Sequence, residues 1–296
     1  MRAEVQQALE VLQQNRPDAV EQALALLQGT VFSFSMRVCG HRQDAEDTMQ
    51  ETLLKAIPYL RRFSSPKALG VWLYKVAKSR CLMSRRRSKF APKQDLSLED
   101  LMPDRKELEA LAGSAADTPE KSFLRGETAE QLRRAVLKLP PPYRLPLVLH
   151  DMEELSTEEV ARVLGLREGT VRVRLHRARV FVRNELARTT GRTRSRKPRT
   201  QPKPRRCREL FAALSNYLDD ALDPALCDTL EEHLDGCRPC QAFLHSLEQT
   251  VERFRRRRPD RLRPEVAAKA RAALLAEYRR LLGALPAPGP KRRSAA

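Results

Sequence analysis

The chain has 296 residues, which is enough for two or three small domains and does not require one large core. Its 56 lysines and arginines against 38 acidic residues give a net charge of +18, so nucleic acid is the first partner to expect; a basic protein whose charge only serves solubility is the alternative. No apolar run approaches the ~18 residues of a membrane span, and the N-terminus lacks the apolar run of a signal peptide, so we expect a cytoplasmic protein with no membrane partner.

Residues 1–90 form the first predicted unit, and it is helical. The segment AVEQALALLQGTVFSFSMRVC is apolar at helical spacing, and DAEDTMQETLLKAIPYL begins with acids suited to a helix N-terminus. The segment PKALGVWLYKVAKSRCLMSRRR begins with a proline and ends in arginines, as a third helix would.

Residues 91–120 hold eight acidic and three basic residues with little periodicity, and they predict a mostly extended, acidic linker. A second helical unit is predicted over residues 121–188. Residues 189–206 then carry a run of bases without acids, which predicts a disordered basic tether. No strand pattern persists, so we expect an all-α fold.

The segment LSTEEVARVLGLREGTVRVRLHRARVFVRNEL, residues 155–186, predicts a helix-turn-helix. Ser156 or Thr157 can cap a short helix, and Gly165 permits the tight turn that follows it. In the second helix, four residues at helical spacing should pack inward: Val171, Leu175, Ala178 and Val182. This leaves a face suited to the DNA major groove, with Arg167, Glu168, Arg172, Val173, His176 and Arg179 near it. The alternative is an ordinary helical hairpin with a solvated basic face.

Two stretches resemble a known family. DAEDTMQETLLKAI with WLYKVAKSRCLMSRRR resembles the second conserved region of sigma-70 factors of the extracytoplasmic function (ECF) class, and LPPPYRLPLVLHDMEELSTEEVARVLGLREGTVRVRLHRAR resembles their fourth region. The resemblance covers about residues 18–188. It implies a factor that directs core RNA polymerase to specific promoters. The alternative is a helix-turn-helix regulator that is not a polymerase subunit. An enzyme is not expected, because the sequence shows no glycine-rich phosphate loop and no open three-ligand metal site with a general base.

The resemblance also implies roles for individual residues. The acidic helix of the first unit would dock on the clamp of the polymerase through Asp44, Glu46, Asp47, Gln50 and Glu51; the alternative is an acid cluster that only offsets the helix dipole. The melted promoter strand would contact Lys75, Lys78, Arg80, Arg85, Arg86 and Arg87, with Trp72 kept as a core residue. Three departures from the family pattern affect any forecast of the promoter base that is read: Leu53, Ser79 and Met83.

The third predicted unit, residues 207–250, reads Cys207-x25-His233-x3-Cys237-x2-Cys240, which is a spacing typical of one tetrahedral zinc ion. Cys227 or His245 could replace Cys207 as the fourth ligand, and unliganded thiols are the alternative to a zinc site. Six cysteines are too few for a disulfide framework, and a reducing compartment would keep them as thiols or metal ligands; Cys39 and Cys81 stand alone.

The third unit also resembles the zinc-binding module of anti-sigma factors, proteins that usually bind sigma factors as separate chains. The resemblance implies control in cis, in which the fused module covers functional surfaces of the sigma portion, and a separate anti-sigma factor is a further possible partner. Residues 251–296 follow, with a basic segment, an amphipathic helix and a tail that we expect to be disordered.

Overall fold

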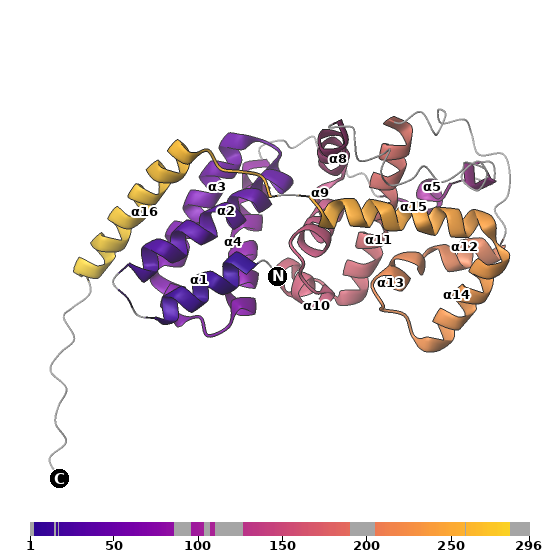
Figure 1. Cartoon of the computed structure of the whole chain (residues 1–296), viewed down its shortest axis with the longest axis horizontal. Coiled ribbons are helices and arrows are strands. Elements are labelled where there is room, and N and C mark those ends of the chain that lie inside the picture. Colours follow the sequence, from indigo (N-terminus) through magenta and orange to yellow (C-terminus); the bar gives the residue numbers. More distant parts are fainter. Residues whose placement is uncertain are drawn as a thin grey trace, which may run out of the picture. The chain divides into compact units, whose positions relative to one another are not determined.

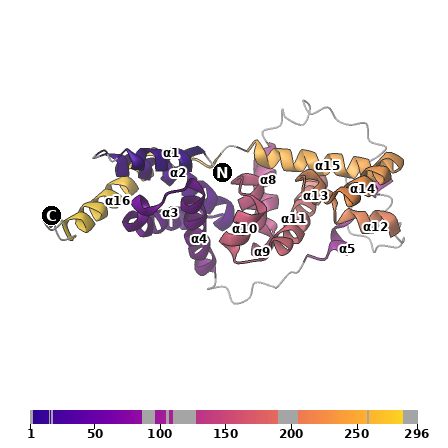
Figure 2. The ribbon, with the colours of Figure 1, turned by 90° about the horizontal axis from the view of Figure 1, so that it is seen from below.

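The computed structural model describes residues 3–14, 16, 18–85, 96–103, 107–109, 127–189, 205–257 and 259–284. These residues form helices and no strands, which confirms the all-α prediction (Figures 1 and 2). They belong to two compact units, one made of residues 1–86 with 259–296 and the other of residues 87–258. Within the described ranges, none of the helices has the length and apolar character needed to cross a membrane.

The first unit is a helical bundle built around α2, which packs against its neighbours along the chain. Its elements are α1 (Ala3–Gln13), α2 (Ala19–Cys39), α3 (Arg42–Ala56), the 3-10 helix η1 (Ile57–Arg62) and α4 (Pro66–Arg85). The rings of Phe34 in α2 and Tyr74 in α4 meet edge to face with centroids 4.9 Å apart. Gly40 ends α2 in the left-handed region at φ 79°, which glycine adopts without strain and which lets α3 turn back.

The C-terminal helix α16 (Pro264–Ala284) belongs to this first unit, where it packs on α2, α3 and η1 (Figure 1). Leu274 is fully buried on its inner face. The segment before the helix is also held, because the backbone amide of Asp260 donates to Ser33 Oγ at 3.1 Å and its carboxylate lies 3.7 Å from the buried Arg37. The predicted tail after residue 284 lies outside the described residues.

Cys39 and Cys81 do not stand alone as we expected from their spacing: they form a disulfide across 42 residues of sequence. Their Cα atoms are 5.7 Å apart, within the usual range for a disulfide. The pairing arises because α2 and α4 pack side by side in the core. The expectation that all six cysteines are thiols or metal ligands is therefore wrong for this pair.

The second unit contains the helix-turn-helix and the cysteine-rich module in one body. Its elements are α5 (Leu98–Leu101), α8 (Glu127–Lys138), α9 (Pro141–Leu147), the π-helical turn η2 (Val148–Met152), α10 (Thr157–Leu164), α11 (Glu168–Thr189), α12 (Arg205–Phe211), α13 (Leu214–Leu218), α14 (Pro224–Gly236) and α15 (Arg238–Arg255). The long helix α15 packs along α11, and α13 packs on α11 as well (Figure 1). Their shared core includes Val180, Phe211, Leu230, Phe243 and Leu247.

Part of the predicted linker contributes to this core. Leu101, Met102 and Leu108 are buried in it, and Asn184 of α11 donates a hydrogen bond to the Leu101 carbonyl at 2.8 Å. We expected a mostly extended segment, and the described part instead includes the helical turn α5, because its leucines find an apolar surface to cover. The rest of the linker, and the predicted tether from residue 190 to 204, lie outside the described residues.

Candidate nucleic-acid interface and metal centre

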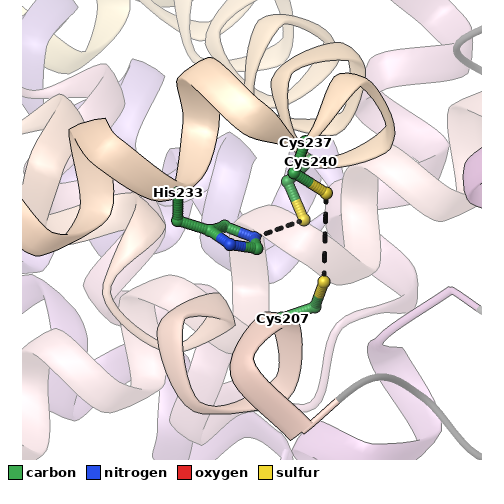
Figure 3. A group of neighbouring side chains, drawn as sticks. All are labelled: Cys207, His233, Cys237 and Cys240. Atoms are coloured by element: carbon green, nitrogen blue, oxygen red, sulfur yellow. Dashed lines mark hydrogen bonds between the residues drawn. The ribbon is translucent and has the colours of Figure 1, made fainter.

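The four predicted metal ligands come together from three helices of the module (Figure 3). Cys207 lies on α12, His233 in the last turn of α14, Cys237 at the junction of α14 and α15, and Cys240 in the first turn of α15. Their ligand atoms all lie within 4.8 Å of one another. The short Cys-x2-Cys turn brings both thiols to the same side of the junction, so that a helix end and a turn converge on one point.

The spacing of these atoms fits a tetrahedral metal. The Sγ atoms of Cys207 and Cys237 are 3.9 Å apart, and His233 Nε2 lies 3.4 Å from Cys240 Sγ. Tetrahedral zinc, with Zn–S bonds of about 2.3 Å and Zn–N bonds of about 2.0 Å, requires ligand atoms about 3.5 to 3.8 Å apart. Burial raises the pKa of the Cys207 and Cys240 thiols, so a nearby cation is needed to hold them as thiolates at neutral pH.

The two other candidate ligands make different contacts. Cys227 Sγ lies 3.6 Å from a carboxylate oxygen of Glu231 on the same helix. His245 contacts Gln249 one turn further along α15, with 3.0 Å between the two Nε2 atoms, and its ring is well exposed. Cys207 is therefore the fourth member of the group.

The helix-turn-helix is formed by α10 and α11, as the sequence predicted. Ser156 caps α10 in a reciprocal arrangement: its Oγ accepts from the Glu159 amide at 3.2 Å, and the Glu159 carboxylate accepts from the Ser156 amide at 2.9 Å. Gly165 takes the left-handed conformation at φ 69° that the turn requires. All four residues predicted to face inward from α11 are buried.

The predicted DNA-facing residues, five on α11 and Arg167 just before it, fall into two groups. Arg167, Glu168 and Val173 are exposed, Val173 by 51%, and Arg172 is partly exposed with an ion pair to Glu168 at 3.2 Å. His176 and Arg179, which we expected near the outward face, retain only 3% and 0% of their surface. The helical period places them outward from the helix-turn-helix, but the module covers that side of α11.

The covered side of α11 carries a buried polar network. Arg179 forms bidentate ion pairs with Asp151 of η2 and with Asp219, which follows α13. Burial alone raises the pKa of Asp151, but the Arg179 charge outweighs it and the net pKa lies well below the ordinary value. His176 Nδ1 lies 2.8 Å from Ser215 Oγ, and burial, together with the charges of Arg179 and Arg177, lowers the pKa of His176 to about 3.

On the open side of α11 lies a hollow of about 400 Å³ that the sequence analysis did not assign. Its lining includes Thr170, Val173, Arg174 and Arg177, which follow one another at helical spacing. Arg174 and Arg177 could have been found by that spacing, because they share the face of the exposed Val173. This face offers both positive charge and an apolar contact.

The predicted polymerase-binding residues lie on α3 of the first unit. Asp47 is exposed, and Asp44, Glu46, Gln50 and Glu51 are partly exposed. Glu46 forms an ion pair with Arg42 at 2.9 Å. Glu51 forms an ion pair with Arg80 of α4, so a predicted polymerase-binding residue contacts a predicted strand-binding residue. The side chains of the cluster extend past the first turn of α3, beyond the part of the helix where the dipole acts most strongly.

Four of the predicted strand-binding residues lie on α4: Lys75, Lys78, Arg80 and Arg85. Lys75 is exposed and Lys78 is half-buried; burial and, to a smaller extent, the neighbouring Lys75 lower the pKa of Lys78. Arg85 is the last residue of α4, and Arg86 and Arg87 lie outside the described residues. Trp72 is half-buried between the rings of Tyr59 and Phe63, at 6.1 and 5.9 Å, as a packing residue would be.

Three families match separate parts of the chain. "Sigma-70 region 2" matches residues 24–90, "Sigma-70, region 4" matches residues 129–182, and "Putative zinc-finger" matches residues 207–241. The first match contains α3 and α4, the second contains α10 and α11 up to residue 182, and the third contains all four members of the Cys/His group.

Several curated proteins are similar to the chain. The RNA polymerase sigma-H factor of Pseudomonas aeruginosa is 30% identical over 182 residues, which are 59% of this chain and 89% of that protein. The ECF RNA polymerase sigma factor SigW of Bacillus subtilis is 29% identical over 57% of this chain and 89% of its own length. The ECF RNA polymerase sigma factor EcfG of Rhodopseudomonas palustris is 30% identical over 50% of this chain and 74% of its own. These relatives correspond to little more than half of this chain, so a large part of it lies beyond the similarity.

Proposed function

The chain belongs to the ECF class of sigma-70 RNA polymerase sigma factors, a non-catalytic family that directs transcription initiation, and we propose that its C-terminal module regulates it in cis. The alternative of a regulator that is not a polymerase subunit is set aside, because the chain matches region 2 as well as the DNA-binding region 4.

We assign core polymerase binding to the acidic face of α3 and promoter binding to α4 and α11. The exposed Asp47 and its neighbours give α3 a negative face, which is complementary to a basic protein surface. The exposed Lys75 and the partly exposed Arg80 suit a single strand, whose backbone needs neutralising. The open face of α11, with Arg172 and Val173, suits base edges in the major groove.

We assign one zinc ion to Cys207, His233, Cys237 and Cys240. Zinc would supply the positive charge that stabilises the thiolates, and it would link the three helices α12, α14 and α15. A module of this size seldom forms a stable core unaided, so its metal contributes directly to its folding. The group has four ligands, which is typical of a structural site and not of a catalytic one.

One observation carries the regulatory proposal: the module packs on α11 and buries His176 and Arg179. A recognition helix must insert its side chains into the groove, so a partner on one side of it limits docking. In the other unit, α16 packs on α3, the helix assigned to polymerase binding. The sigma portion is therefore expected to be less active in the intact chain than alone.

Reconstituted transcription with purified core polymerase tests this proposal. The intact chain is compared with a chain truncated after Leu186, which retains almost the full length of the relatives. We expect stronger promoter-specific initiation from the truncated chain. Equal activity of the two chains would sink regulation in cis and leave the sigma assignment untouched.

The same comparison separates a redox sensor from a constitutive structural zinc. Oxidation of Cys237 and Cys240 consumes two thiolate ligands and releases the metal. A sensor predicts that oxidant raises the activity of the intact chain towards that of the truncated chain. A constitutive site predicts lower stability of the module with no gain in initiation.

A further inference from the structure

Arg179 is the centre of the contact between the module and the recognition helix. Its guanidinium is fully buried and is held by two carboxylates. Asp151 accepts from Nε at 2.9 Å and from Nη2 at 2.6 Å, whereas Asp219 accepts from Nη1 at 2.7 Å and from Nη2 at 2.9 Å. Both pairs are bidentate, which is the strongest arrangement that arginine makes with a carboxylate.

The two carboxylates come from different parts of the unit. Asp151 lies in η2, within the region 4 match, and Asp219 lies in the zinc-finger match. If the module leaves α11, Arg179 keeps Asp151 and is not left as an unpaired buried charge. Asp219 therefore stabilises the closed arrangement without being needed for the fold of region 4.

The local backbone fixes the position of Asp219. The chain reverses just after α13, where Asp220 adopts a left-handed conformation at φ 50° and the Ala221 amide donates to the Asn216 carbonyl at 2.8 Å. The Ser215 carbonyl also accepts from Arg179 Nη1 at 3.2 Å. A carboxylate held by a tight turn loses little conformational freedom when it binds, so the pair retains most of its energy.

We infer that Asp219 is a latch that holds the module on the recognition helix by binding Arg179. The inference rests on the proposed regulation in cis and names its principal contact. Under the proposed regulation, DNA binds only when the module has left α11, so the latch lowers the apparent affinity of the intact chain for promoter DNA in proportion to the fraction of molecules that stay open.

The test uses the intact chain with Asp219→Asn, which removes the charge and keeps the shape. Asp235→Asn is the matched control, because Asp235 is an exposed acid of the same module. The truncated chain gives the fully open reference. The probe is a promoter duplex selected by that truncated chain from a random library, and the readouts are its dissociation constant and the zinc content of each variant.

We expect Asp219→Asn to keep its zinc and to bind the duplex about tenfold more tightly than the natural chain, the factor that corresponds to one hydrogen-bonded charge pair. Asp235→Asn should bind as the natural chain does. If truncation tightens binding while Asp219→Asn does not, the latch is refuted and regulation in cis stands. If truncation changes nothing, the proposed function itself fails.

Amide hydrogen exchange separates a latch from a folding residue. Under the latch, Asp219→Asn speeds exchange in α13, which is too short to persist without packing on α11, and spares α12, α14 and α15, which carry the metal ligands. Faster exchange across all four helices, with loss of zinc, would mean that Asp219 maintains the fold of the module, and the latch would be overturned.

Discussion

The burial of His176 makes the closure of the module on α11 sensitive to pH. His176 lies against Ser215 of α13 and the ring of Phe211 of α12, and it shares its own helix with the charges of Arg177 and Arg179. Burial, the largest cause, and those two charges lower its pKa from 6.5 to about 3. If the module leaves, the imidazole meets water and loses the largest cause of the shift, so its pKa rises towards the ordinary value.

The size of the effect follows from this difference. When the module is packed on α11, buried His176 stays unprotonated. The packing is therefore most favourable above the ordinary pKa of 6.5, and it weakens as the pH falls from there towards the buried pKa of about 3. Between about pH 7.5 and pH 5.5 the closure equilibrium loses up to about tenfold, or about 1.4 kcal/mol, which is the value for a full return to the ordinary pKa. No further loss from this group is expected below the folded pKa.

Amide hydrogen exchange in α13, corrected for the intrinsic effect of pH, measures this equilibrium. His176→Gln is the control, because it keeps a polar contact for Ser215 and removes the titrating group. It also accounts for the pH dependence of the metal ligands. If the natural chain and His176→Gln lose protection equally, His176 does not titrate between the two forms and the argument is wrong.

The remaining predictions concern the metal, the packing and the two proposed binding surfaces. Cys237→Ser should lower the metal content from close to one zinc per chain, as measured by elemental analysis; unchanged zinc would remove Cys237 from the site. Phe243→Ala should destabilise the module by about 3–5 kcal/mol in urea unfolding, because the buried ring packs against Phe211 and under the Arg183 guanidinium; a loss below about 1 kcal/mol would contradict this packing. Asp47→Arg should abolish core polymerase binding while promoter-element recognition by α11 persists. Arg172→Ala should weaken promoter-element recognition while core polymerase binding persists. Loss of polymerase binding in both folded variants would refute the division between the two surfaces. Promoter binding by the holoenzyme should weaken steeply with salt, by a log-log slope of about 0.9 for each phosphate contact, and a flat response would count against the DNA surfaces.

Local features were predictable from the sequence because they depend on residues close together in the chain. The cap at Ser156, the glycine turn and the inward face of α11 follow from the spacing of a few side chains, and the structure contains each of them. The Cys-x2-Cys turn with His233 close before it likewise required only local spacing. The assignment to the ECF class rested on two such local segments in the correct order; the two family matches confirm the sigma-70 regions, and the ECF relatives confirm the class.

Contacts between distant segments were decided only by the tertiary structure. Helical period correctly separates the inner face of α11 from the outer one, but it cannot show that a module some forty residues later covers part of the outer face. The choice of Cys207 over Cys227 depends on how α12 packs against α14, and the Cys39–Cys81 disulfide depends on how α2 packs against α4. The periodicity of apolar residues indicates which side chains of a helix are buried. Which segment buries them depends on how whole helices pack, and no local sequence pattern specifies that segment.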